Sequence, residues 1–547
     1  MGCLRILEMY ENCVAQLLIM RACSATIRTV FRFTSITSYL AAFALCCNSA
    51  AARDVRIEHV TVVSPERSQP IRDATVYIHD DRIVSISPAT AVAVGTSETN
   101  ADVLDGHGLY LVPGLIDSHV HTSDLPGIDN SHEPTREIAE AIRKQTPRSY
   151  LFYGYTTLID LITTPERIAA WNTYEAHPDL YFCGGAQIPG GYPPIQFVSA
   201  QDRRSLTRYM LVERGEEGKA PEGIDPVAHT PDAVVARMKQ DGALCVKTFY
   251  ERGFGEIDEL PAPRLDTVRD LVKAAHSAHM PVLIHANGTD AQEFAVKAGG
   301  DIIAHGLWHW NREQQATELT PRAKAILDSV LKADMGWQPT MQVLYGLQDL
   351  FDPGYLSQTG VARVVPASAI EWYRSPQGQW FHDSLAPAFL PKPVKEAHDP
   401  QAQWNAARAS IAPPIMRDRN ATHYMATHGA RILFGTDTPS APTYANLPGL
   451  NGWQEMQHML EAGMTPRQIF RAATISNAEA FGLDREIGTV EPGKRANLLL
   501  LRRDPTQTVD ALDDIFKVIL GGRVIDRAEL AANRRTNGTG RAGQSRR

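Results

Sequence analysis

The chain has 547 residues, of which 44% are hydrophobic and 21% are charged, a composition typical of a globular protein. Its formal net charge of −8 argues against a nucleic-acid partner, because such proteins usually carry an excess of basic residues. The length is sufficient for one large (β/α) barrel together with a smaller domain.

Residues 1–52 differ in composition from the rest of the chain. Arginines precede the apolar stretch at 36–47 (ITSYLAAFALCC) and small residues follow it, which is the order found in a secretory signal peptide. The stretch is too short for a stable membrane span. We therefore predict cleavage after Ala51 or the next residue, and export to the periplasm or the exterior. A lipid anchor at Cys46 or Cys47 and a buried apolar helix are the alternatives.

Two cysteines follow the predicted signal peptide. Cys183 and Cys245 both lie inside apolar, strand-like runs. Cysteines in such runs are usually buried thiols, so we predict two free thiols and no disulfide framework.

Short strand patterns occupy both ends of the mature chain. Residues 53–112 alternate Val, Ile and Tyr with polar residues, and a similar pattern returns at 483–526. Since the two ends of a domain often lie close together, we expect both segments to form one small β-sandwich. The Gly- and Arg-rich residues 527–547 are predicted to form a disordered tail.

Between these segments, residues 113–482 alternate strands with helices. We predict eight strands, at residues 111–121, 153–161, 179–188, 243–251, 280–288, 301–308, 334–343 and 431–439. Strands separated by helical crossovers form a parallel sheet, so the predicted fold class is α/β, a (β/α)8 TIM barrel with the additional β-sandwich. The long segment 344–420, rich in Trp, Tyr and Pro, is predicted to be a lid or binding loop inserted into the barrel.

Side chains that can bind a metal stand at the carboxyl ends of five predicted strands. They are His119, His121, Lys247, His285, His305 and Asp437. In a barrel the carboxyl ends of all strands converge above one cavity, so these residues would meet although they are distant in the sequence. Side chains two apart on a strand point the same way, so the first two histidines can share one ion. Imidazole and carboxylate ligands favour zinc, with iron and manganese as alternatives.

The motifs PGLIDSHVH, VKTFY, LIHANG, IIAHG and FGTDTP, with the closing segment ATISNAEAFGLDREIGTVEPGKRANLLLL, occur in this order along the chain. Together they resemble the amidohydrolase superfamily, in particular its imidazolonepropionase-like and prolidase-like metal hydrolases. The resemblance runs from about residue 57 to residue 525. It implies a metal-dependent barrel with a small β-sandwich formed by both chain ends.

In binuclear members of this superfamily, carbon dioxide carbamylates a lysine on the fourth strand, and the new carboxylate bridges two metal ions. Lys247 occupies the matching position, so the resemblance implies two divalent ions, expected to be zinc, with carbamylated Lys247 between them. One ion would be held by His119, His121 and Asp437, and the other by His285 and His305.

Alternatively, an unmodified Lys247 could pair with an acid such as Glu251, since a charged lysine cannot bind a metal. A single-metal site would then remain on the other residues, namely His119, His121, His285 and Asp437. Single-metal deaminases of the superfamily add a glutamate a few residues before a further histidine. Residues 280–309 contain no such pair, which argues against deamination.

These residues and the resemblance predict an enzyme that hydrolyses a carbon–nitrogen bond in a small-molecule substrate. A hydroxide bridging the two ions would attack an amide carbonyl, and Asp437 would move the proton to the leaving nitrogen. We expect an N-acyl amino acid or a small peptide as substrate, because an exported enzyme meets such compounds. A mononuclear cyclic-amide hydrolase or deaminase, and a non-catalytic binding protein on the same barrel, are the alternatives. Homo-oligomerisation is left open.

Three further residues near these strand ends are candidate substrate contacts. Tyr250 follows Lys247 by three positions, His309 lies just beyond His305, and His132 lies in the loop after the first barrel strand.

Overall fold

The computed structural model describes residues 54–88, 101–129, 131–194, 200–253, 259–440 and 442–533. The predicted signal segment 1–52 and the end of the predicted tail, 534–547, lie outside the described residues. Within the described ranges, no helix is both long and apolar enough to cross a membrane.

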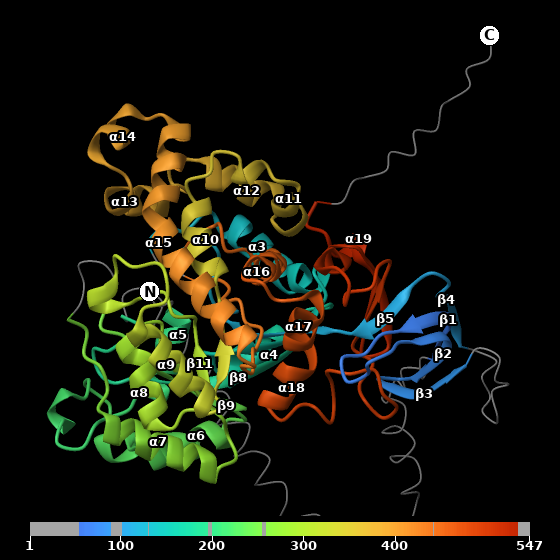
Figure 1. The fold of residues 1–547 in the computed structure, drawn as a ribbon, viewed down its shortest axis with the longest axis horizontal. Coiled ribbons are helices and arrows are strands. Elements are labelled where there is room, and N and C mark those ends of the chain that lie inside the picture. Colours follow the sequence, from blue (N-terminus) through green and yellow to red (C-terminus); the bar gives the residue numbers. More distant parts are fainter. Residues whose placement is uncertain are drawn as a thin grey trace, which may run out of the picture. The chain divides into compact units, whose positions relative to one another are not determined.

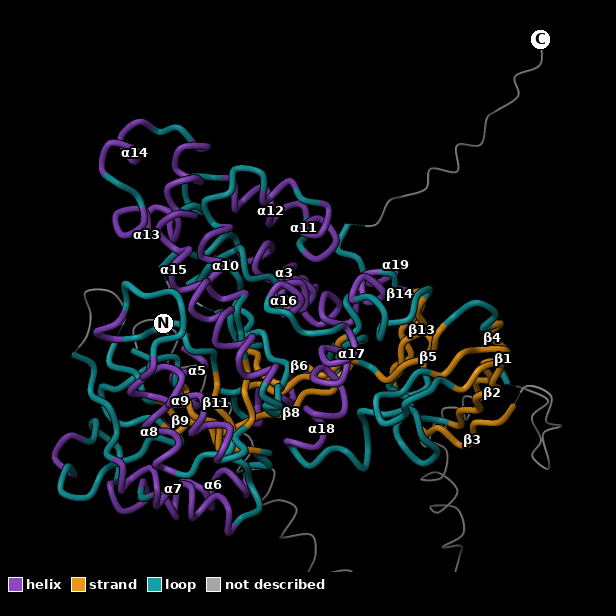
Figure 2. The backbone as a smooth tube through the Cα atoms, in the orientation of Figure 1, coloured by secondary structure: helices purple, strands orange, loops and turns teal. Residues whose placement is uncertain are grey.

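A parallel sheet of seven strands forms the centre of the protein (Figures 1 and 2). Its strands follow one another in chain order: β6 (Leu115–Val120), β7 (Tyr155–Asp160), β8 (Asp179–Ala186), β9 (Cys245–Phe249), β10 (Val282–His285), β11 (Ile302–Ala304) and β12 (Gly336–Gln338). Nearly all residues of these strands are buried. Because parallel strands are covered on both faces, they appear in the sequence as continuous apolar runs.

The crossovers between these strands are helical. They contain α3 (Arg136–Phe152), α4 (Pro165–Trp171), α5 (Ala200–Arg208), α6 (Pro231–Gln240), α7 (Leu265–Ser277), α8 (Thr289–Ala298) and α9 (Pro321–Lys332). Three of them, α4, α6 and α9, begin at a threonine followed by proline. In α6 and α9 the Thr230 and Thr320 hydroxyls accept the backbone N–H three residues on. Helices α6 to α9 lie side by side along the outside of the strands (Figure 1).

The predicted eighth strand, residues 431–439, takes a less regular form. Parallel bridges join Trp337 to Ile432 and Val120 to Thr438, so this segment lies between the last strand, β12, and the first, β6. Asp437 has a left-handed φ of 57°, which interrupts the extended conformation that a strand needs. The curled sheet and this segment have the form of a TIM-like barrel.

Strands from both segments that were predicted to form a β-sandwich join in a second, eight-stranded sheet. Its members are β1 (Asp54–Val62), β2 (Ile71–His79), β3 (Arg82–Pro88), β4 (Asp102–Asp105), β5 (Tyr110–Pro113), β13 (Leu498–Leu501), β14 (Ile515–Leu520) and β15 (Arg523–Asp526). The two ends meet where β13 pairs antiparallel with β5. In β13, Leu498 and Leu500 pack into the core of this sheet, whereas Leu499 and Leu501 pack into the main core.

The inserted segment 344–420 is helical, which corrects the expectation of a loop. It lies within α10 (Gln342–Asp349), α11 (Thr359–Val364), α12 (Ala367–Arg374), α13 (Trp380–Phe389), α14 (Lys392–Ala397) and α15 (Pro400–Thr427). Its prolines led to the loop prediction, but several of them stand at helix starts, and Pro413 and Pro414 lie within the 28-residue helix α15. Figure 1 shows these helices gathered on one side, away from β1 to β4.

Four further helices follow the barrel strands in the chain: α16 (Leu450–Glu461), α17 (Pro466–Arg471), α18 (Asn477–Ala480) and α19 (Arg527–Leu530). A π-helical turn at Ala472–Ser476 joins α17 to α18. Short 3-10 turns elsewhere in the described residues lie at Glu217–Lys219, Pro226–His229, Asn311–Glu313, Tyr355–Ser357 and Val509–Asp513. Helix α19 packs against α3, so the segment predicted as a disordered tail from residue 527 begins with an ordered helix.

Cys183 and Cys245 form a disulfide, so the prediction of two free thiols is wrong. The two residues stand directly opposite each other in the register of β8 and β9, with their Cα atoms 4.4 Å apart. They are 62 residues apart in sequence, and only the strand pairing brings them together.

Candidate metal centre

Imidazole and carboxylate groups from distant parts of the sequence lie where the barrel strands end. His119 lies on β6 and His285 is the last residue of β10, while His305 directly follows β11. Asp437 lies in the segment that joins β12 to β6. All four residues are buried.

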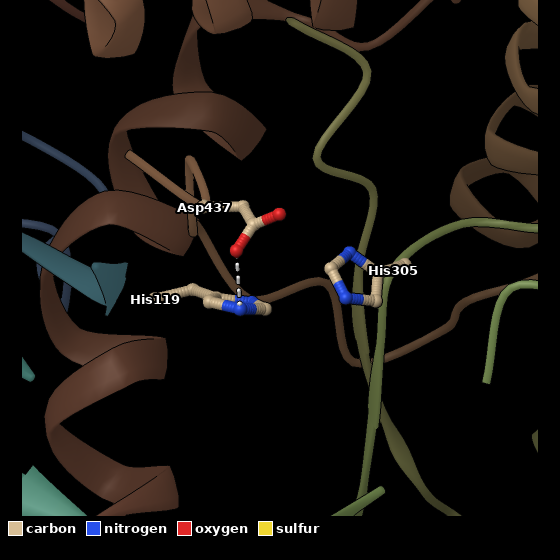
Figure 3. A group of neighbouring side chains, drawn as sticks. All are labelled: His119, His305 and Asp437. Atoms are coloured by element: carbon tan, nitrogen blue, oxygen red, sulfur yellow. Dashed lines mark ion pairs between the residues drawn. The ribbon is translucent and has the colours of Figure 1, made fainter. Parts of the chain in front are cut away.

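The described residues contain one group of side chains placed to share a metal ion: His119, His305 and Asp437 (Figure 3). Each offers a ligand atom, and these atoms all lie within 4.8 Å of one another. His121 also faces this group, because its Nε2 lies 2.9 Å from Asp437 Oδ1. The ring of His285 has its centroid 4.5 Å from that of His305.

The backbone at this site is held in an unusual conformation. His305, Thr340 and Asp437 have left-handed φ values of 84°, 49° and 57°, although none is glycine. Each such residue costs on the order of 1–3 kcal/mol, which the surrounding structure must offset. Strain of this kind is concentrated at functional sites.

Buried Lys247 Nζ has no hydrogen-bond partner. Buried His119 Nε2 makes no well-formed hydrogen bond, although it lies within ion-pair distance of Asp437 Oδ1, at 3.0 Å. An unpartnered polar atom in the interior is costly, and native proteins rarely leave one without a role. The imidazoles and the carboxylate are also the donor set that zinc prefers. The residues present therefore fit a divalent metal ion.

Burial sets the protonation of these groups. Burial, with the nearby charge of Lys247, lowers the pKa of His119 to about 3, and burial also lowers the pKa values of His285 and His305. These three imidazoles are therefore neutral near pH 7, which is the form that binds metal. At His121, Asp437 outweighs burial and raises the pKa to about 9, so this imidazole is protonated near pH 7 in the metal-free protein and releases that proton if it binds a metal ion.

Lys247 on β9 is 1% exposed. Burial lowers its pKa to about 7, because an ammonium group loses its hydration inside the protein. A substantial fraction of this amine is therefore neutral near pH 7. Glu251, the acid considered as its partner, instead lies with Oε2 3.2 Å from His285 Nε2.

Some polar contacts at the site are absent from the sequence prediction. Gln338 Oε1 lies 3.1 Å from His119 Nδ1, and Thr340 Oγ1 lies 3.0 Å from His305 Nδ1. Both residues stand at the end of the seventh predicted barrel strand. That position could have identified them in the sequence as contacts of the site. The ring of Tyr192 lies 4.5 Å from that of His285, and no sequence pattern pointed to it.

The three predicted substrate contacts are not members of the metal-binding group. The Tyr250 ring packs on Phe294 at 4.3 Å. His309 Nδ1 lies 3.0 Å from the Asn311 side chain. The His132 ring stacks on Trp380 of α13 at 4.1 Å, so the inserted helices contact the loop that follows β6 and His121.

A buried carboxyl behind the site is expected to make stability depend on pH. Glu455 of α16 accepts the backbone N–H groups of Met341 and Gln342, just after Thr340, and burial raises its pKa from 4.5 to about 8. The folded state then binds more protons than the unfolded state between these values, so its contribution to the unfolding free energy falls as pH rises. Each unit of pKa difference corresponds to about 1.4 kcal/mol.

The Glu455→Gln variant should lose this dependence. Relative to the wild type, its unfolding free energy is expected to improve steadily from pH 4.5 to pH 8, measured by urea denaturation. A constant difference between the two proteins across this range would contradict the assignment.

The sequence pattern of the amidohydrolase family matches residues 110–316 and 402–525. The chain belongs to the amidohydrolase family. The matched residues include both chain segments that carry the metal-binding group, and the unmatched stretch between them contains the inserted helices α10 to α14.

The similar proteins of known activity include deaminases. The chain is 22% identical over 505 residues to 5'-deoxyadenosine deaminase of Methanothermobacter thermautotrophicus, covering 86% of this chain and 93% of that protein. It is 39% identical over 83 residues to adenine deaminase of Roseobacter denitrificans, but this match covers only 15% of this chain and 14% of that protein.

Solved structures with the same fold include a dipeptidase and an ochratoxinase. A Xaa-Pro dipeptidase with methionine bound in its active site has a TM-score of 0.58 at 19% identity, covering 86% of this chain and 100% of that one. A. niger ochratoxinase has a TM-score of 0.58 at 18% identity, covering 89% and 99%. These amidohydrolase structures support the TIM-like barrel.

Proposed function

We propose that this amidohydrolase is a metal-dependent enzyme that hydrolyses an amide bond in an N-acyl amino acid or a small peptide-like substrate. The observation that carries the proposal is the buried group of His119, His305 and Asp437, with Lys247 Nζ unpartnered nearby. A neutral, buried amine is the form of lysine that reacts with carbon dioxide.

In this proposal, His119, His121 and Asp437 would hold one divalent ion, and His285 with His305 would hold a second. Carbamylated Lys247 would supply a further carboxylate ligand. When bound, such ions supply Lewis acidity and lower the pKa of solvent. Asp437 takes the proton from the attacking water and delivers it to the leaving nitrogen. The neighbouring histidines outweigh burial and hold the pKa of Asp437 well below the ordinary range, so its carboxylate is ionised, which is the form that binds a metal ion and can accept a proton.

Substrate choice rests on the solved structures. One is a Xaa-Pro dipeptidase and another an ochratoxinase, and both share the barrel of this chain. Deamination of a purine compound is the second candidate, because two similar proteins are an adenine deaminase and a 5'-deoxyadenosine deaminase. The products separate the two: hydrolysis of an acyl amino acid releases an amine and a carboxylate, whereas deamination releases ammonia.

We also propose that the protein is exported. The Cys183–Cys245 disulfide supports this, since disulfides persist mainly in oxidising compartments. Detection of the mature chain in a periplasmic or culture fraction, with its N-terminus near Arg53, tests the proposal.

Metal content is the first test. Protein purified without chelators is expected to contain about two equivalents of divalent metal, and Lys247→Met is expected to lower this to about one. The variant removes the amine but keeps a buried side chain of similar length. Lys239→Met, on an exposed position of α6, is the control. About one equivalent of metal in both the wild type and Lys247→Met would favour a single-metal site. A wild-type protein that binds no metal after reconstitution would contradict the proposal.

A further inference from the structure

A buried side-chain amide connects two strands directly beneath the metal-binding group. Gln338, the last residue of β12, is fully buried. Its Nε2 donates to the Ser118 carbonyl oxygen at 3.2 Å and to Ser118 Oγ at 2.8 Å. Its Oε1 lies 3.1 Å from His119 Nδ1. One glutamine therefore bonds to two successive residues of β6.

These contacts determine which nitrogen of His119 carries the proton. A backbone carbonyl can only accept, so the Gln338 group facing Ser118 O must be the amide N–H. The group facing His119 is then the amide oxygen, which also can only accept. His119 Nδ1 must therefore donate, which leaves a lone pair on Nε2.

The anchor of this amide is itself fixed. Ser118 Oγ lies 2.7 Å from the Phe434 carbonyl and 3.2 Å from Asn477 Oδ1. Asn477 Nδ2 donates to the carbonyl oxygens of Ile116 and Phe434. Asn477 of α18 thus holds β6 against the segment that carries Asp437, and Ser118 cannot turn away from Gln338 without breaking these bonds.

The backbone of Gly435 packs closely against both residues. A Cβ atom at Gly435 would lie 2.7 Å from His119 Cβ and 3.2 Å from Gln338 Nε2. Glycine at this position therefore leaves the space that His119 Cβ and the Gln338 amide occupy.

We propose that Gln338 is a positioning residue that holds His119 as the tautomer with its proton on Nδ1, so that the Nε2 lone pair faces Asp437 and His305. Without Gln338, His119 could carry its proton on Nε2 and donate it to Asp437 Oδ1, only 3.0 Å away. That internal hydrogen bond would satisfy both groups and compete with a cation. Gln338 prevents that hydrogen bond by keeping His119 Nε2 unprotonated, so that two acceptor atoms, His119 Nε2 and Asp437 Oδ1, face each other. The inference rests on the proposed metal site for its purpose, but the tautomer is a property of the metal-free protein.

The tautomer is measurable by NMR of metal-free protein labelled with ¹⁵N-histidine, with His119 assigned by its loss in His119→Gln. Wild type is expected to show a protonated Nδ1 and an unprotonated Nε2. Gln338→Met, which keeps the length but removes the acceptor, is expected to shift His119 toward the Nε2-protonated form.

Metal affinity, measured by competition with a chromogenic zinc chelator, is the second readout. Gln338→Met is expected to bind zinc about 10- to 100-fold more weakly, the usual effect of losing a partner of a metal ligand. Gln145→Leu is the matched control, since Gln145 is also buried and hydrogen-bonded but lies on α3. It should bind zinc as the wild type does.

The outcomes are distinguishable. An Nε2-protonated His119 in the wild type overturns the inference, and this measurement does not depend on a variant that folds. An unchanged His119 tautomer in Gln338→Met also overturns it. An equal loss of affinity in Gln145→Leu also overturns it. A tautomer shift in a protein that binds no zinc at all would support the role of Gln338 and refute the proposed function.

Discussion

The Asp437→Asn variant is expected to lose about 10²- to 10⁴-fold in kcat/KM for the amide substrate, the usual effect of removing a general base. Asp437 Oδ1 lies 3.0 Å from His119 Nε2 and 2.9 Å from His121 Nε2, so the carboxylate is central to the group. Asparagine keeps the shape of the side chain but can neither take up a proton nor supply a negative charge to a metal ion.

Metal analysis of the variant distinguishes a loss of proton transfer from a loss of metal binding. If the variant retains its metal, the loss reports on proton transfer, and kcat should fall more than KM rises. If the metal is lost too, the carboxylate acts first as a ligand. Asp349→Asn, a half-buried carboxyl on α10, is the control and should retain full activity. An Asp437→Asn enzyme with wild-type kcat/KM would refute the proposed role.

Removing the Cys183–Cys245 disulfide is expected to lower the unfolding free energy by about 4 kcal/mol. The bond joins residues 62 apart, and closing a loop of that length restricts the unfolded chain. Both cysteines are fully buried in the barrel, so alanine at both positions should leave the surface of the protein unchanged.

Denaturant unfolding of the oxidised wild type and the Cys183→Ala/Cys245→Ala variant measures this difference. The midpoint should fall in the variant, and added reductant should lower the wild-type midpoint but not that of the variant. A variant as stable as the oxidised wild type would show that the bond contributes nothing to stability.

Local residue patterns were sufficient to predict the barrel strands. Seven of the eight predicted segments contain a strand of the parallel sheet, because strands buried on both faces need continuous apolar runs. The pairing of both chain ends in one sheet was also predictable from their shared alternation. The segment at 431–439 differs because Asp437 adopts a left-handed conformation there, and an apolar run does not reveal the φ of one residue.

The sequence by itself determined the candidate ligands. They are polar residues at the ends of apolar strands, and a barrel brings the carboxyl ends of all its strands together. Only the tertiary structure decided the contacts between strands: the pairing of Cys183 with Cys245, the contact of Glu251 with His285, and the bond from Gln338 to His119. Each depends on the register or spacing of segments distant in the chain, and no local pattern encodes that register. The physical reason is that propensity and periodicity act over a few residues, whereas ligand orientation is set by side chains that meet across the barrel.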